Sequence, residues 1–94
     1  MVHSWTRMPP DTLLLEEVDD FLCCYCVVTG RTHILDAFPA ELVRLLSDRA
    51  HTAQELAEAI ASQVGEHDTA DWLSRIEPLL VDLEGLGLLR QVAG

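Results

Sequence analysis

The hydrophobic pattern of this chain changes its period once, between Leu35 and Phe38. Before this point, short apolar runs are separated by tight-turn signals, a pattern typical of antiparallel strands. After it, leucines recur every three or four residues, as in amphipathic helices. Strands followed by helices within 94 residues indicate one α+β domain, because a second core would be too small to support itself.

Three runs in the first part predict an antiparallel meander. Residues 12–18 are rich in leucine and fit a strand or a helix on pattern alone. Residues 21–28 are apolar throughout and include aromatic and β-branched side chains, so we expect a strand covered on both faces. Residues 32–35 predict a third strand. An Asp-Asp pair suits the first turn, and Gly30 suits the second because glycine adopts positive φ without strain.

The first predicted helix starts at Asp36 or Pro39 and ends near Ser47 and Asp48. The second has a clear start signal, because Thr52 and Glu55 have the spacing of a capping box. We expect it to end at Gly65.

The third predicted helix runs from Asp68 to Gly85 or Gly87, with Pro78 inside it as a kink or a break. The order of elements is therefore βββααα, a winged helix-turn-helix-like α+β fold in which a three-stranded antiparallel meander precedes three helices. We place this domain at residues 12–90, between a flexible N-terminal arm at residues 1–11 and a C-terminal tail at residues 91–94.

All three cysteines lie in the stretch CCYC, at residues 23, 24 and 26. On a strand, Cys24 and Cys26 share one face and Cys23 points to the other. A zinc site there would need further ligands, for which only His33 is near in sequence. We therefore interpret the thiols chiefly as core packing, with a metal or redox role as an open alternative. We expect no cofactor and no metal.

Charge and hydropathy limit the function classes. The formal net charge is -10, which disfavours binding to nucleic acid phosphates and anionic membranes. No apolar run is long enough to span a membrane or to act as a signal peptide, so we expect a cytoplasmic protein with reduced thiols. The four histidines are scattered and no nucleophile motif is present, so we expect no enzymatic activity and no catalytic residues.

A peptide-binding surface is suggested by two neighbouring features. Residues 32–35 lead into the first helix and are expected to form a sheet edge with unpaired backbone groups. The third helix has a wide apolar arc, which leaves Trp72 and Leu79 beside its core stripe, with Arg75 between them. An edge strand beside an apolar helix face suits β-augmentation. On pattern alone, a simple widening of the core contact explains the arc equally well.

The stretch VTGRTHILDAFPAELVRLL resembles the PqqD-like family, also described as the RiPP recognition element. The shared positions are Gly30, Thr32, His33, Leu35, Asp36, Ala40, Glu41, Leu42, Leu45 and Leu46. The resemblance covers roughly residues 13–90 and is closest to the PqqD-like peptide chaperones of the HPr-rel-A system. The chain departs from the family at Cys26-Val27, where an Asn-Pro is common, and at Arg31, where the family has an acidic residue.

The resemblance implies a non-catalytic chaperone that binds the leader of a ribosomally made precursor peptide and presents it to a modifying enzyme. Such an enzyme would be a radical-SAM protein or an HPr-kinase-related protein. By position, the peptide-binding residues would be Arg31, Thr32, His33, Ile34 and Leu35 on the strand, with Trp72, Arg75, Ile76 and Leu79 on the helix.

Three alternatives stay open on the sequence. The first is a small acidic winged-helix transcription regulator or protein-interaction module, although the third helix carries a single arginine among five acidic residues. The second is a thiol metal sensor. The third is a homodimer formed by pairing the exposed edge with a second copy.

Overall fold

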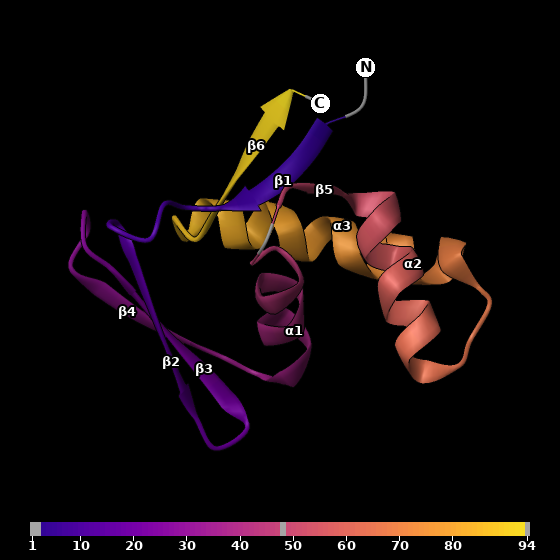
Figure 1. The fold of residues 1–94 in the computed structure, drawn as a ribbon, viewed down its shortest axis with the longest axis horizontal. Helices are drawn as coiled ribbons and strands as arrows, with labels where there is room; N and C mark the ends of the chain where they lie inside the picture. Colours follow the sequence, from indigo (N-terminus) through magenta and orange to yellow (C-terminus); the bar gives the residue numbers. More distant parts are fainter. Residues whose placement is uncertain (1–2, 48, 94) are drawn as a thin grey trace.

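Two small antiparallel sheets and three helices make up the protein, in a computed structural model that describes residues 3–47 and 49–93 (Figure 1). In chain order the elements are β1 His3–Arg7, β2 Leu13–Val18, β3 Phe21–Cys26, β4 Arg31–Leu35, α1 Ala37–Leu45, β5 His51–Thr52, α2 Ala53–Val64, α3 Thr69–Gly85 and β6 Leu89–Ala93. One sheet has the order β2-β3-β4 and the other β5-β1-β6.

The predicted meander is confirmed, and three helices follow it. Strands β2, β3 and β4 pair with their sequence neighbours in antiparallel register. Asp19 occupies the first turn with φ 55°, a conformation that aspartate tolerates better than most residues. Gly30 has φ 71° in the second turn, as expected for a glycine there. The α+β, winged-helix-like order predicted from the sequence is therefore correct for this part of the chain.

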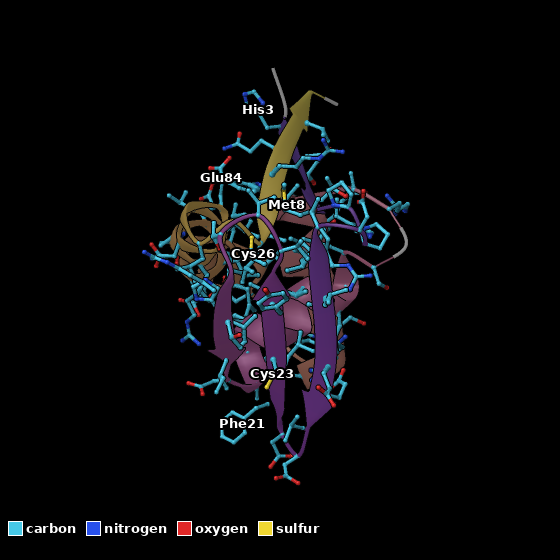
Figure 2. All side chains as sticks on the ribbon, turned by 90° about the vertical axis from the view of Figure 1, so that its left-hand side faces the viewer. His3, Met8, Phe21, Cys23, Cys26 and Glu84 are labelled. Atoms are coloured by element: carbon cyan, nitrogen blue, oxygen red, sulfur yellow. The ribbon has the colours of Figure 1, made fainter. Side chains whose placement is uncertain are left out.

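The prediction for the middle strand was wrong in two respects. β3 ends at Cys26, and Val27 and Val28 belong to the turn rather than to the strand. The strand is also covered on one face only, because Phe21 and Tyr25 are 44% and 40% exposed while alternate residues are buried. Helix α1 packs on β3 and β4 from the inner side, and no element of the described chain occupies the outer side (Figure 2).

The helix boundaries follow their capping signals. Thr52 and Glu55 form the predicted capping box, with reciprocal hydrogen bonds of 2.9 and 3.0 Å. Gly65 ends α2 in the left-handed conformation, with φ 74°. The Asp68 side chain caps α3 by accepting a hydrogen bond from the Asp71 amide. Helix α3 then continues through Pro78 without a break.

The two ends of the chain form strands, which corrects the expectation of a flexible arm and a tail. β1 and β6 pair along their whole length, from His3 with Ala93 to Arg7 with Leu89. Two residues explain why this pairing is stable: Trp5 is 7% exposed and Leu89 is 2% exposed, and both belong to the main core. The folded unit therefore extends beyond residues 12–90 at both ends, while residues 1, 2 and 94 lie outside the described part.

One core cluster connects the two sheets and the three helices. Its fully buried large side chains are Leu22, Leu42, Leu56, Ile76, Leu80, Leu83, Leu88, Leu89, Val43 and Cys24. Within residues 3–47 and 49–93, no helix is long and apolar enough to cross a membrane.

Candidate functional site at the β4 edge

Strands β2 and β4 are the two edges of the β2-β3-β4 sheet, and the hydrogen-bond pattern shows which backbone groups of β4 point away from β3. The Val27 amide donates to the Thr12 carbonyl, and the Gly30 amide donates to the Cys26 carbonyl. Since strand residues alternate in direction, odd-numbered residues of β3 bond to β2 and even-numbered ones bond to β4. The amide and carbonyl groups of Thr32 and Ile34 therefore point away from the sheet.

Two contacts link α3, or the chain just after it, to residues next to β4. The ring of Phe38, in the first turn of α1, contacts the Trp72 ring edge-on, with 5.6 Å between the two ring centroids. Cys26 pairs with Arg31 in the sheet. Its Sγ lies 4.0 Å from the carbonyl oxygen of Gly87, which follows α3. Trp72 and Gly87 are about 22 Å apart along a helix axis, which is longer than the five-residue strand β4 at about 13–17 Å. Figure 2 shows α3 nearly end-on, on the β4 side of the sheet, so the helix axis crosses the direction of the strand.

Three partly exposed apolar side chains lie along one side of α3 and just beyond its end. Trp72, Leu79 and Leu86 are spaced by seven residues and therefore lie on one side of the helix. Trp72 and Leu79 are half-buried against the core, and Leu86 is 40% exposed. Together with the edge groups of Thr32 and Ile34, these side chains form what we call the β4–α3 site.

Trp72 is held in place by three contacts. Besides the Phe38 ring, its indole Nε1 donates a 2.8 Å hydrogen bond to Glu66 Oε2. The Arg75 guanidinium lies over the indole, 5.0 Å from the ring centroid, and pairs with Asp71 at 3.1 Å. A ring fixed in this way presents a rigid apolar surface, since it has little conformational freedom left to lose on binding.

The nine residues proposed from the sequence divide into two groups. Those with an accessible side chain or edge backbone are Arg31, Thr32, Ile34, Trp72, Arg75 and Leu79, with His33 half-buried. Leu35 and Ile76 are 6% and 0% exposed and belong to the core, so a peptide would not touch the Ile76 side chain in this conformation. Leu86, which is not among these nine residues, completes the stripe of apolar side chains.

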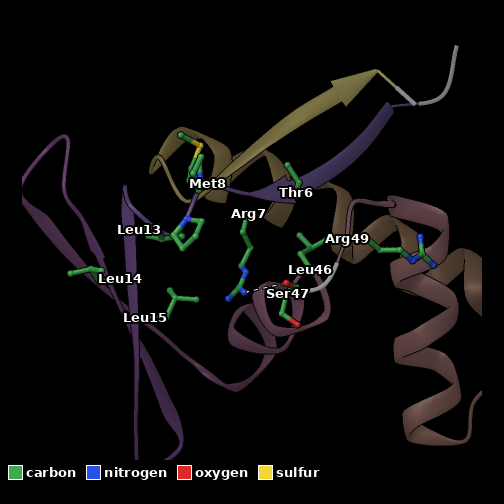
Figure 3. Close-up of a pocket in the computed structure, with 11 residues that line it drawn as sticks. Thr6, Arg7, Met8, Leu13, Leu14, Leu15, Leu46, Ser47 and Arg49 are labelled. Atoms are coloured by element: carbon green, nitrogen blue, oxygen red, sulfur yellow. Dashed lines mark hydrogen bonds between the residues drawn. The ribbon is translucent and has the colours of Figure 1, made fainter.

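The opposite edge of the sheet borders a pocket of about 500 Å³ between β2, the β1–β2 connection and the end of α1 (Figure 3). Arg7 extends from β1 towards α1, and its Nη2 donates a 3.5 Å hydrogen bond to the Ser47 carbonyl. The wall consists mainly of apolar side chains, among them Met8, Leu13 and Leu46. The sequence did not predict this pocket, because it depends on how β1 and α1 are placed around β2.

The side chains of the three cysteines point to the predicted faces of β3. Cys24 and Cys26 are 0% and 5% exposed on the inner face, Cys23 lies on the outer face, and all three thiols are free. Burial raises the pKa of Cys24 to about 11, while hydrogen bonds from Thr29 lower the pKa of Cys26. Across the described ranges, no three His, Cys, Asp or Glu side chains are grouped to hold a metal ion.

Comparisons with protein-family models, with curated proteins and with solved structures found no match for this chain.

Proposed function

We propose that this protein is a non-catalytic peptide-binding chaperone, which binds the leader of a ribosomally made precursor peptide by strand addition to β4. It would present the peptide to a modifying enzyme, such as a radical-SAM protein or an HPr-kinase-related protein. The observation that supports the proposal is a sheet edge with outward backbone groups at Thr32 and Ile34, near an α3 side chain, Trp72, that is fixed against Phe38.

The site offers the two elements that strand addition needs. The outward amide and carbonyl groups of Thr32 and Ile34 supply main-chain hydrogen bonds. A peptide strand paired there would direct alternate side chains towards α3, where Trp72 and Leu79 provide apolar contacts. Arg31 and Arg75 border this region in a chain with only six arginines and no lysine, so an acidic residue in the leader would be favoured.

The proposal is tested by titrating ¹⁵N-labelled protein with synthetic leader segments of the precursor peptides encoded beside its gene. We expect the amide signals of residues 32–35 and those of α3 to shift together, because the peptide would contact both. Shifts limited to β2, or no shift with any of these peptides, would contradict the proposal.

Two variants of Ile34 distinguish the contribution of its backbone to peptide binding from that of its side chain. Ile34→Pro removes an outward amide without removing a hydrogen bond to β3, so we expect loss of peptide binding with the helices still folded. Ile34→Ala keeps that amide and changes only a side chain that is 65% exposed on the outer face. This variant should bind the leader as the wild type does, and equal binding by both variants would exclude strand addition at β4.

A further inference from the structure

The outer face of the β2-β3-β4 sheet is almost entirely apolar. The pairing register assigns eight side chains to it, namely Leu14, Glu16, Val18, Phe21, Cys23, Tyr25, Thr32 and Ile34. Only Glu16 and Thr32 among them are polar. Figure 2 views the molecule from this side, with Phe21 and Cys23 labelled on the open face of the sheet.

These apolar side chains are exposed to a degree that is unusual for a sheet face. Leu14 is 54% exposed, Phe21 is 44% exposed and Ile34 is 65% exposed. A contiguous apolar face bordered by polar residues is typical of a surface that another molecule covers. The inner face of the same sheet is buried under α1 and the core, so the apolar character of the outer face is not needed to close that core.

The charges around this face are acidic and unevenly placed. Asp19 and Asp20 form the β2–β3 turn, and Asp36 follows β4 at the same end of the sheet. Glu16 lies in the middle row of the face, beside Cys23. An apolar face with an acidic end and one carboxylate on its β2 edge complements a partner that has leucine-like side chains flanked by lysine or arginine.

A second copy of the chain fits this face poorly. If two sheets packed with their strands parallel, the two turns would bring Asp19, Asp20 and Asp36 of both copies to one end. If they packed with strands antiparallel at full overlap, β2 would lie over β2 and the two Glu16 carboxylates would meet at the middle of this edge. Either arrangement places like charges together, and each copy carries a net charge of -10.

We infer that the outer face of the β2-β3-β4 sheet docks a second protein through an amphipathic segment whose apolar stripe is flanked by basic residues. The face is formed by side chains normal to the sheet, whereas the β4–α3 site uses the strand edge. The two surfaces therefore bind different partners, and docking at the outer face does not require a peptide at β4.

The test uses a synthetic 14-residue amphipathic helical peptide of leucine and lysine, and a matched peptide in which every lysine is glutamate. We expect the lysine peptide to bind and to shift amide signals of β2 and β3, while the glutamate peptide does not bind. The double variant Leu14→Thr/Phe21→Thr should weaken binding of the lysine peptide roughly tenfold or more, because two buried apolar contacts are lost.

The matched control is Val64→Thr/Val81→Thr, which changes two helix side chains that are 53% and 56% exposed elsewhere on the surface. Both double variants keep the net charge, and amide spectra report whether each is folded. Equal binding of the lysine peptide by both double variants would show that charge alone attracts it and would overturn the inference. A wild-type dimer that Leu14→Thr/Phe21→Thr converts to a monomer would overturn it too, in favour of self-association.

Discussion

Cys24 is the residue whose chemistry is most altered by the fold. Its side chain is fully buried on the inner face of β3, where the thiolate loses its hydration and the pKa rises from 9.0 to about 11. Cys24 therefore has a measurable effect on the alkaline stability of the protein.

We predict that the free energy of unfolding falls as the pH rises from 9 towards 11. Over this range the folded protein keeps the Cys24 proton, which the unfolded chain releases, and linkage then lowers stability as the pH increases. Cys24→Ala should show a shallower fall in denaturant titrations at several pH values. An unchanged slope in this variant would mean that Cys24 does not cause the effect.

Residue patterns predicted the direction in which a side chain points better than how deeply that side chain is buried. The alternation of CCYC correctly placed Cys24 and Cys26 on one face, because side-chain direction on a strand is a local property. On α3, helical spacing placed Leu79 beside the core stripe, whereas Ile76 was assigned to the peptide-binding surface only by its position in the family resemblance. Ile76 is 0% exposed because α3 packs against α2 and β6, and this packing is a property of the tertiary fold.

At the level of elements, the predictions succeeded where the signal was local. The capping box at Thr52, the glycine at residue 65 and the two turns of the meander each lie within a few residues of the element they define. Strands β1 and β6 were missed because their pairing joins residues 3–7 to residues 89–93. A short stretch such as HSWTR carries no periodic signal of its own, and only its distant partner makes it a strand.

The burial of Trp5 allows the role of β1 to be measured. We expect Trp5→Ala to lower the free energy of unfolding by about 3–5 kcal/mol, the usual cost of removing a large aromatic side chain from a core. Denaturant titration followed by far-UV circular dichroism would measure this loss. Trp72→Ala is the comparison, because Trp72 is only half-buried, and its effect on stability should be smaller. A negligible effect of Trp5→Ala would mean that β1 is not part of the cooperative unit.

On the scale of the whole molecule, the larger sheet has three different environments. Its inner face carries the core, its β4 edge lies on the side of the sheet where Figure 2 shows α3, and its outer face is apolar and open. The two proposed binding surfaces share Thr32 and Ile34, but one uses their backbone and the other their side chains. A peptide at the edge and a protein on the face would thus be held next to each other, which is what presentation to an enzyme requires.

The pairing of β1 with β6 also determines how the protein responds to mechanical force. His3 and Ala93 face each other at one end of an antiparallel pair, so tension on the two chain ends breaks the hydrogen bonds one after another. We predict a low unfolding force in optical-tweezers experiments when handles are attached at residues 3 and 93. Handles at residues 3 and 89, at opposite ends of the pair, would load all its bonds at once and should require a higher force. Equal forces would show that another element resists the load. A molecular machine that pulls on one of these two strands while the other is anchored would therefore separate β1 from β6 one hydrogen bond after another.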